Sequence, residues 1–230
     1  MKNRILALVK PLMLSIFAIA VFTLGQSVTR ADEVFIAGFT NGCFGAGCTP
    51  PSTSANQTAT LLGLTYQNST FSGTTSGGFL AIGNVGQPPG TPNVDNLGSF
   101  TLSGEPANYN GQAFTLRVTF TAPPGIAGPN TTTFSAILTG SVSAADNGGV
   151  FIDFDNTPQT FTFNNNGTTG SFTFRVLDAA VIAGGTVAVE GVITGAQQNP
   201  IPEPATLLLL GTGLSGVAAG IRKRRKAVKG

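Results

Sequence analysis

Apolar and polar residues alternate with a period of two along much of the segment between residues 32 and 200. In the clearest run, 114–121, Phe, Leu, Val and Phe alternate with Thr, Arg, Thr and Thr. The runs 150–155 and 172–176 share this period. Such alternation is typical of antiparallel strands that bury one face and expose the other to water. We therefore expect a strand in each of the three runs.

Further strands are expected where apolar and β-branched residues cluster between turn signals, at 33–40, 59–66, 78–83, 97–103, 133–143, 159–164 and 186–194. Asn164-Asn-Asn-Gly167 predicts a hairpin turn, because Gly readily takes a positive φ. About ten short strands without a helical stripe predict an all-β fold, an antiparallel β-sandwich of the Ig-like or jelly-roll type. The fifteen Phe residues of this body are its expected core.

The N-terminus has the features of a secretory signal. Lys2, Arg4 and Lys10 form a basic region, and the apolar run that follows extends to Leu24. Small residues precede Asp32, so we expect a signal helix within 1–31 and cleavage between Ala31 and Asp32, with Ser27 as the second choice. The alternative is an uncleaved anchor helix, but the apolar run is short for a membrane span.

Three features follow one another at the C-terminus. Pro202, Glu203 and Pro204 come first, and the uncharged apolar stretch 205–221 is next. A basic cluster then closes the chain, formed by Arg222, Lys223, Arg224, Arg225 and Lys226. At ~1.5 Å per residue, a helix of this length is at the short limit for a bilayer, and the cluster would stay cytoplasmic. We therefore expect an exported domain at 32–195, a linker at 196–204, a transmembrane helix at 205–221 and a basic cytoplasmic tail at 222–230.

This order of motif, apolar helix and basic cluster resembles the PEP-CTERM sorting signal of Gram-negative bacteria, over about residues 200–226. The resemblance implies processing by an exosortase near Pro202-Glu203-Pro204. It further implies export across the inner membrane, transient membrane anchoring, and release to the cell surface or an exopolysaccharide matrix. It carries no information about the activity of the exported domain. The alternative is an ordinary tail anchor in which Pro-Glu-Pro occurs by chance.

Charge and composition exclude several classes of function. The net charge of +2 is concentrated at the two ends, because residues 32–200 hold two Arg against nine acids, about −7 in all. Such a body is a poor nucleic-acid binder, since each phosphate contact needs a cation. With no His there is no Ser-His-Asp triad and no imidazole metal ligand, and two Cys cannot form a four-thiolate site. We expect no cofactor.

A few residues remain as candidates for local chemistry. Cys43 and Cys48 would lie in an oxidising compartment, so we expect a disulfide between them. Asp153 and Asp155 would share one strand face, which makes them a weak calcium candidate, although a solvated outer face explains them equally. Two neighbouring carboxylates could also form a glycosidase pair. The absence of Trp argues against a sugar-cleaving site.

We therefore expect a non-catalytic exported protein, structural or adhesive in an exopolysaccharide matrix. The alternative is a carbohydrate- or ice-binding module, for which outward Thr residues such as Thr119, Thr121, Thr160 and Thr162 could provide the surface. A secreted hydrolase is the second alternative. Specific, saturable binding to one polysaccharide would separate the first two.

Overall fold

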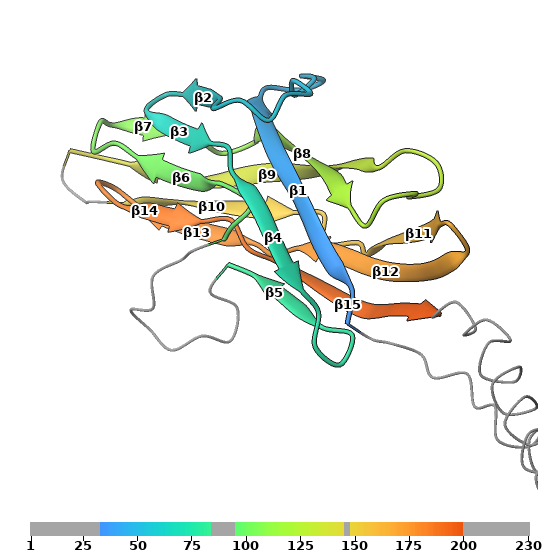
Figure 1. The fold of residues 1–230 in the computed structure, drawn as a ribbon. Helices are drawn as coiled ribbons and strands as arrows, with labels where there is room; N and C mark the ends of the chain where they lie inside the picture. The colour runs from blue at the N-terminus through green and yellow to red at the C-terminus, as the bar shows by residue number, and fades with distance from the viewer. Residues whose placement is uncertain (1–32, 84–94, 145–147, 200–230) are drawn as a thin grey trace, which may run out of the picture. The chain divides into compact units, whose positions relative to one another are not determined.

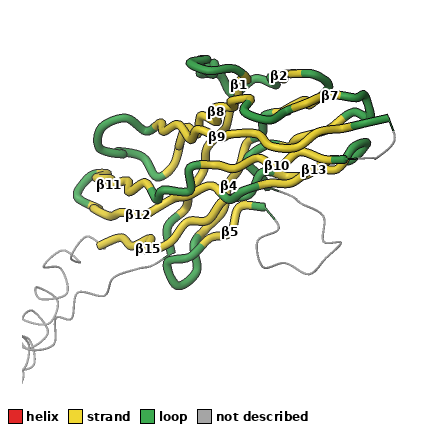
Figure 2. Tube along the Cα trace, turned by 180° about the vertical axis from the view of Figure 1, so that it is seen from behind, coloured by secondary structure: helices red, strands yellow, loops and turns green. Residues whose placement is uncertain are grey.

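The computed structural model describes residues 33–83, 95–144 and 148–199, and these form an all-β fold (Figure 1). Figure 2 shows strands and loops but no helix in the described part of the chain. Every strand pair within it is antiparallel, as the alternation predicts. The expected signal helix in 1–31 and transmembrane helix at 205–221 lie outside the described residues.

The described strands form three sheets. The largest has seven strands in the order β13-β10-β9-β8-β1-β4, with β7 paired to β9. Its members are β1 (Phe35–Phe44), β4 (Thr70–Thr74), β7 (Ala107–Asn108), β8 (Gln112–Ala122), β9 (Thr131–Val142), β10 (Gly149–Phe154) and β13 (Ala179–Ile182). In Figure 1, β1 and β4 cross steeply over the direction of β9 and β10, so this sheet is strongly twisted.

The other two sheets have four strands each. One has the order β11-β12-β15-β5 and consists of β11 (Gln159–Asn165), β12 (Thr168–Val176), β15 (Gly191–Asn199) and β5 (Leu80–Ile82). The other has the order β14-β6-β3-β2 and consists of β14 (Thr186–Ala188), β6 (Ser99–Leu102), β3 (Leu64–Gln67) and β2 (Thr58–Leu61).

Strand β8 joins two aromatic clusters in the core. Its inner residues Phe114, Leu116, Val118 and Phe120 are each at most 1% exposed. Near its start, the Phe114 ring packs against rings of the β14-β6-β3-β2 sheet, with Tyr66 at 5.1 Å and Phe100 at 5.0 Å. At its end, the Phe120 ring meets the β11-β12-β15-β5 sheet, through Phe161 at 4.7 Å and Phe172 at 5.0 Å. One face of the seven-stranded sheet thus packs on both smaller sheets.

The period-two pattern correctly predicts which residues are buried. Val150, Ile152 and Phe154 point inward, whereas Phe151 and Asp153 between them are exposed. The expectation that all fifteen Phe form the core is wrong, because ten are buried. Phe35, Phe79 and Phe151 are 55%, 47% and 43% exposed, and Phe39 and Phe44 are half-buried.

Three strand predictions differ from the structure. The expected strand 59–66 is a hairpin of β2 and β3, since Leu62 and Gly63 take positive φ values of 50° and 84°. The expected strand 186–194 divides into β14 and β15. Strands β4, β7 and β13 were not predicted, because they are short and carry weak alternation. The expected hairpin turn is present, with Asn166 and Gly167 at φ values of 50° and 91° between β11 and β12.

The first and last described residues lie next to each other. Strand β15 continues to Asn199, four residues beyond the domain end expected at 195. Near that end, Gln198 Nε2 donates a hydrogen bond of 3.2 Å to the backbone oxygen of Glu33. The chain therefore enters and leaves the domain at one place.

Candidate functional site

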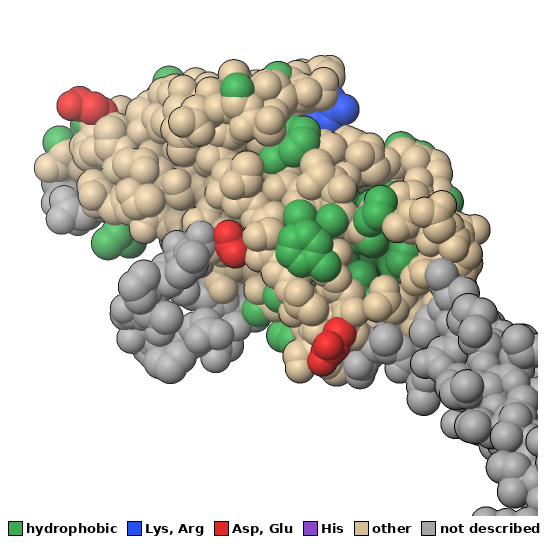
Figure 3. Space-filling view, viewed as in Figure 1, with side chains coloured by type: hydrophobic (Ala, Val, Ile, Leu, Met, Phe, Trp, Pro, Cys, Tyr) green, Lys and Arg blue, Asp and Glu red, His purple; other side chains and the backbone are tan. Residues whose placement is uncertain are grey.

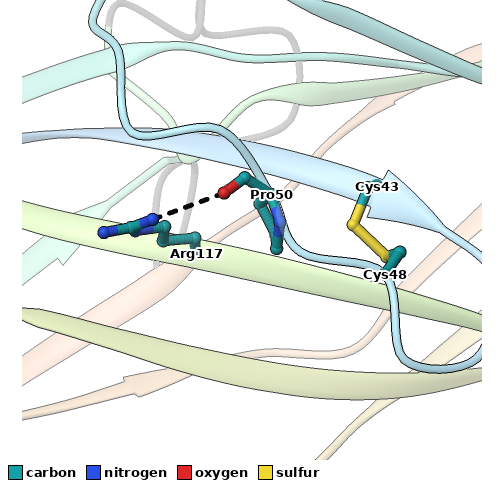
Figure 4. The surroundings of a disulfide bond; sticks show 4 residues. All are labelled: Cys43, Cys48, Pro50 and Arg117. Atoms are coloured by element: carbon teal, nitrogen blue, oxygen red, sulfur yellow. Dashed lines mark hydrogen bonds between the residues drawn. A yellow bond between two sulfur atoms is a disulfide. The ribbon is translucent and has the colours of Figure 1, made fainter.

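A segment of 13 residues, 45–57, which we name the strap, covers part of the outer face of the seven-stranded sheet. It follows β1 and is joined to that strand at its start by the Cys43–Cys48 disulfide, with a Cα–Cα distance of 6.1 Å (Figure 4). Further along, Asn41 Nδ2 donates a hydrogen bond of 2.8 Å to Thr53 O. At the end of the strap, Gln57 N donates to Asn68 Oδ1 at 2.8 Å. The strap is therefore attached to the sheet at its start, its middle and its end.

The strap buries polar groups of the two strands beneath it. Asn41 and Arg117 are direct cross-strand partners in β1 and β8, and Asn41 is 0% exposed. The Arg117 guanidinium points toward the strap, where Nη1 donates a 3.3 Å hydrogen bond to Pro50 O (Figure 4). Its Nε is buried without a hydrogen-bond partner in the described part of the chain. Asn41, by contrast, has its amide satisfied, which makes its burial tolerable.

The two carboxylates predicted as a weak calcium candidate lie on the outer face near the end of β10. Both Asp153 and Asp155 are exposed. The backbone N–H and the hydroxyl of Thr157 donate to Asp155 Oδ1, and these hydrogen bonds lower the pKa of this carboxyl because they favour its charged form. Asp155 thus stabilises the turn after β10.

Asp178, which the sequence did not single out, has a similar role. Its Oδ1 accepts hydrogen bonds from Phe154 N at 2.9 Å and from Asn156 Nδ2 at 3.1 Å. Within 33–83, 95–144 and 148–199, no group of three or more His, Cys, Asp and Glu side chains is placed to hold a metal ion. Asp155 and Asp178 therefore stabilise the loop after β10 through their hydrogen bonds.

An open apolar hollow lies on the outer face at the other side of the seven-stranded sheet. It has a volume of about 370 Å³ and is lined by Thr139, Gly140, Gly149, Phe151, Ala180 and Ile182, among others. Phe151 lies in register with Thr139 and Ala180, so three strands contribute to its floor and walls. A Cβ at Gly140 would come within 2.2 Å of Gly149 O, so this position requires glycine. No side chain from this position therefore fills the hollow. Sequence reasoning missed this hollow because it depends on the pairing of three separate strands, β9, β10 and β13.

A row of four threonines crosses the outer face of the β14-β6-β3-β2 sheet. The strand register aligns Thr60 with Thr65, Thr65 with Thr101, and Thr101 with Thr186. The Thr60 and Thr65 hydroxyls are 3.0 Å apart, and those of Thr101 and Thr186 are 2.9 Å apart. Of the threonines expected to face outward, Thr121, Thr160 and Thr162 are exposed, but Thr119 is buried on β8, where its hydroxyl lies 3.2 Å from that of Thr131. The longer row could not be found from the sequence, since it depends on the pairing of four separate strands.

The shifted pKa of Tyr66 has a structural cause. Its hydroxyl is buried and lies 2.7 Å from Leu97 O and 2.9 Å from Thr40 Oγ1. Desolvation raises the pKa of Tyr66 far above its ordinary value, because the phenolate would lose its contact with water. The group stays protonated and ties β3 to β1.

Comparison with known proteins identifies the C-terminal segment. Residues 200–225 match the PEP-CTERM protein-sorting motif. The chain therefore carries this sorting motif where the order of Pro-Glu-Pro, apolar stretch and basic cluster predicts it. The motif implies an exported protein whose membrane-anchored precursor is processed by an exosortase. No curated protein and no solved structure matches the chain.

Several predicted site residues belong to segments outside the described residues. These are the Pro202-Glu203-Pro204 sequence of the sorting motif, the basic cluster Arg222–Lys226, and the cleavage pair Ala31 and Asp32. Within the described ranges, the structure contains no helix with the length and apolar character needed to cross a membrane.

Proposed function

We propose that this chain is a non-catalytic protein of the cell surface or extracellular matrix, delivered there by its sorting motif. The observation that carries this proposal is the match of residues 200–225 to the PEP-CTERM protein-sorting motif. The expected order of events is export, removal of residues 1–31, pausing in the membrane through 205–221, and release by an exosortase. In the matrix, the exported domain would have a structural or adhesive role among exopolysaccharide chains.

Two features of the described domain support this role, its few charged side chains and its packed aromatic core. Its acids Asp155 and Asp178 are engaged in turns, and Arg117 is held under the strap. We assign the domain to the β-sandwich class of the Ig-like or jelly-roll type. The support for this assignment is that β8 packs, through Phe114 and Phe120, on both four-stranded sheets. A closed aromatic core of this kind suits a protein that persists outside the cell.

The test of sorting is to replace Pro202, Glu203 and Pro204 together by Ala and to follow the protein by cell fractionation. Two prolines hold the backbone around Glu203 extended, which gives a protease an accessible peptide to bind. We expect the variant to be exported and folded, yet to stay in the inner-membrane fraction at precursor size. Appearance of the shorter form at the cell surface would mean that a general protease releases a plain anchor.

Deletion of Arg222–Lys226 is the matched control, because it changes the same tail on the other side of the apolar stretch. Translocating a cluster of charges is costly, so the deletion should weaken membrane retention while leaving the Pro-Glu-Pro sequence intact. We expect some uncut chain to escape into the medium, which the triple Ala variant should not do.

A second candidate function, a carbohydrate-binding module, is favoured by the apolar hollow. Phe151 is 43% exposed there beside two glycines, and an exposed aromatic ring next to backbone polar groups suits one face of a sugar ring. The ice-binding form of this alternative would instead use the Thr60–Thr65–Thr101–Thr186 row. Pull-down with matrix polysaccharide tests the sugar-binding form. Saturable binding that Phe151→Ala abolishes, and Phe79→Ala leaves unchanged, would favour it over a purely structural role.

A further inference from the structure

Two exposed phenylalanines lie at the end of the domain where the chain enters and leaves. We name this region the exit end and define it as residues 33–35, 74–79 and 196–199. Phe35, the first residue of β1, is 55% exposed, and Phe79, which follows the turn after β4, is 47% exposed. The strand register pairs Phe35 with Thr74, so β4 leads directly from one phenylalanine toward the other.

The backbone around Phe79 is firmly held. Gly77 and Gly78 both have positive φ values, 58° and 73°, in a two-residue turn closed by reciprocal hydrogen bonds between Ser76 and Phe79. Ala196 N of β15 donates to Gly78 O at 3.1 Å, which fixes the tip of the turn against that strand. Hydrogen bonds therefore hold the backbone at Phe79 in place, so the exposure of its side chain follows from the fold.

Phe35 is held by the same element. Val34 N donates a 2.7 Å hydrogen bond to Thr75 Oγ1, and Thr75 N donates a 3.0 Å bond to Val34 O. These two bonds join the start of β1 to the base of the β4–β5 turn. The backbone positions of Phe35 and Phe79 are thus fixed by hydrogen bonds to the same turn, which limits the backbone entropy lost on binding.

The short connection between Asn199 and the apolar stretch indicates which surface lies next to the exit end in the anchored precursor. Only residues 200–204 separate Asn199 from Ala205, where the apolar stretch begins. Even fully extended, this connection reaches about 20 Å. While the precursor is anchored, the exit end is therefore confined near the lipid surface, at a high effective concentration.

The chemistry of the exit end suits a lipid interface. Its side chains include Thr, Ser, Gln and Asn, and its one ionisable side chain is Glu33. On the face seen in Figure 3, charged side chains are sparse and hydrophobic ones gather over β1 and β4. A domain of negative net charge has no electrostatic attraction to an anionic membrane, so lipid contact would depend on apolar insertion.

We propose that Phe35 and Phe79 insert into the lipid interface while the precursor is membrane-anchored. This contact holds the domain against the outer surface of the membrane. It thereby holds the Pro202-Glu203-Pro204 segment within reach of a membrane-embedded protease. This inference rests on the proposed anchoring of the precursor and adds the surface through which the folded domain meets the lipid. After cleavage the tether is lost, and two side chains alone give a weak, reversible contact that permits release.

The absence of Trp from the natural chain allows a direct test with one fluorescent reporter at a time. Phe35→Trp and Phe79→Trp place the reporter at the exit end. Phe151→Trp, at a Phe of similar exposure on β10, is the matched control. Each chain, beginning at Asp32 as signal cleavage would leave it and retaining the apolar stretch 205–221, is reconstituted in phosphatidylcholine vesicles with a fraction of brominated acyl chains, which quench only nearby Trp. We expect quenching of both exit-end reporters to be roughly twofold stronger than that of Phe151→Trp, as interfacial insertion requires.

Equal quenching at the three positions, or none at the exit end, would overturn the proposal. A blue-shifted exit-end emission that depends on protein density and not on brominated lipid would also overturn it, because a second copy would then cover this surface. The measurement uses uncut chain without exosortase. A failure of the sorting proposal would therefore appear in the fractionation experiment and leave this result unchanged.

Discussion

The outer face of the seven-stranded sheet differs between its two sides. Over β1 and β8, the strap covers the strands and buries the polar side chain of Asn41 completely. Over β9, β10 and β13, no described segment lies across the strands, and Phe151 and Ile182 are 43% and 72% exposed. The covered side thus buries polar groups, whereas the open side exposes apolar side chains beside polar ones such as Thr139 and Asp153.

Hydrophobic burial alone would cover the apolar side chains and leave the polar ones in water, which is the reverse of this arrangement. The covered side is stable because the amide of Asn41 donates to Thr53 O and the strap is joined to β1 by a disulfide. The open side leaves apolar area in water, a common property of surfaces that bind ligands or partners. We infer that the strap is structural and that a ligand of the domain would bind at the open side.

The largest expected effect concerns the core that both sides share. Phe120 of β8 is 1% exposed and packs on the rings of Phe161 and Phe172. Phe120→Ala should lower the free energy of unfolding by about 3–5 kcal/mol, since it removes a large side chain and leaves a cavity. Urea denaturation of the exported protein measures this change. A loss below about 1 kcal/mol would show that the aromatic cluster does not join the sheets as described.

An intermediate effect is expected on the covered side. Replacing Cys43 and Cys48 together by Ser should cost about 2 kcal/mol, because the disulfide closes only a short loop. The variant should stay folded, since the Asn41–Thr53 and Gln57–Asn68 hydrogen bonds still attach the strap. Thermal unfolding with circular dichroism checks this. Complete unfolding at room temperature would mean that the strap, and not the core, determines the stability of the domain.

The smallest effect is expected on the open side. Phe151→Ala should change the free energy of unfolding by no more than about 0.5 kcal/mol, because the ring is 43% exposed. The same denaturation experiment measures it. A loss as large as that of the double Cys variant would contradict the distinction between a structural covered side and an open side free for ligands.

The sequence predicts the buried faces of long strands well, because alternation over Phe114–Phe120 or Val150–Phe154 is a local property. It also predicts the hairpin turn at Asn164–Gly167 from local turn chemistry. The division of 59–66 was missed because the turn is formed by Leu62, which is rarely found at positive φ. The strap and the hollow were missed because they depend on contacts between residues far apart in sequence, such as Arg117 with Pro50. The sorting motif was predictable because its three parts are contiguous.

The most direct test of the central claim is the intact mass of the protein recovered from the membrane and from outside the cell. The account predicts a precursor in the membrane that begins at Asp32 and retains the apolar stretch 205–221. It predicts a shorter product outside that begins at the same residue and ends near Pro202–Pro204. Recovery outside the cell of a chain that retains residues 205–221 would contradict sorting through the motif at 200–225.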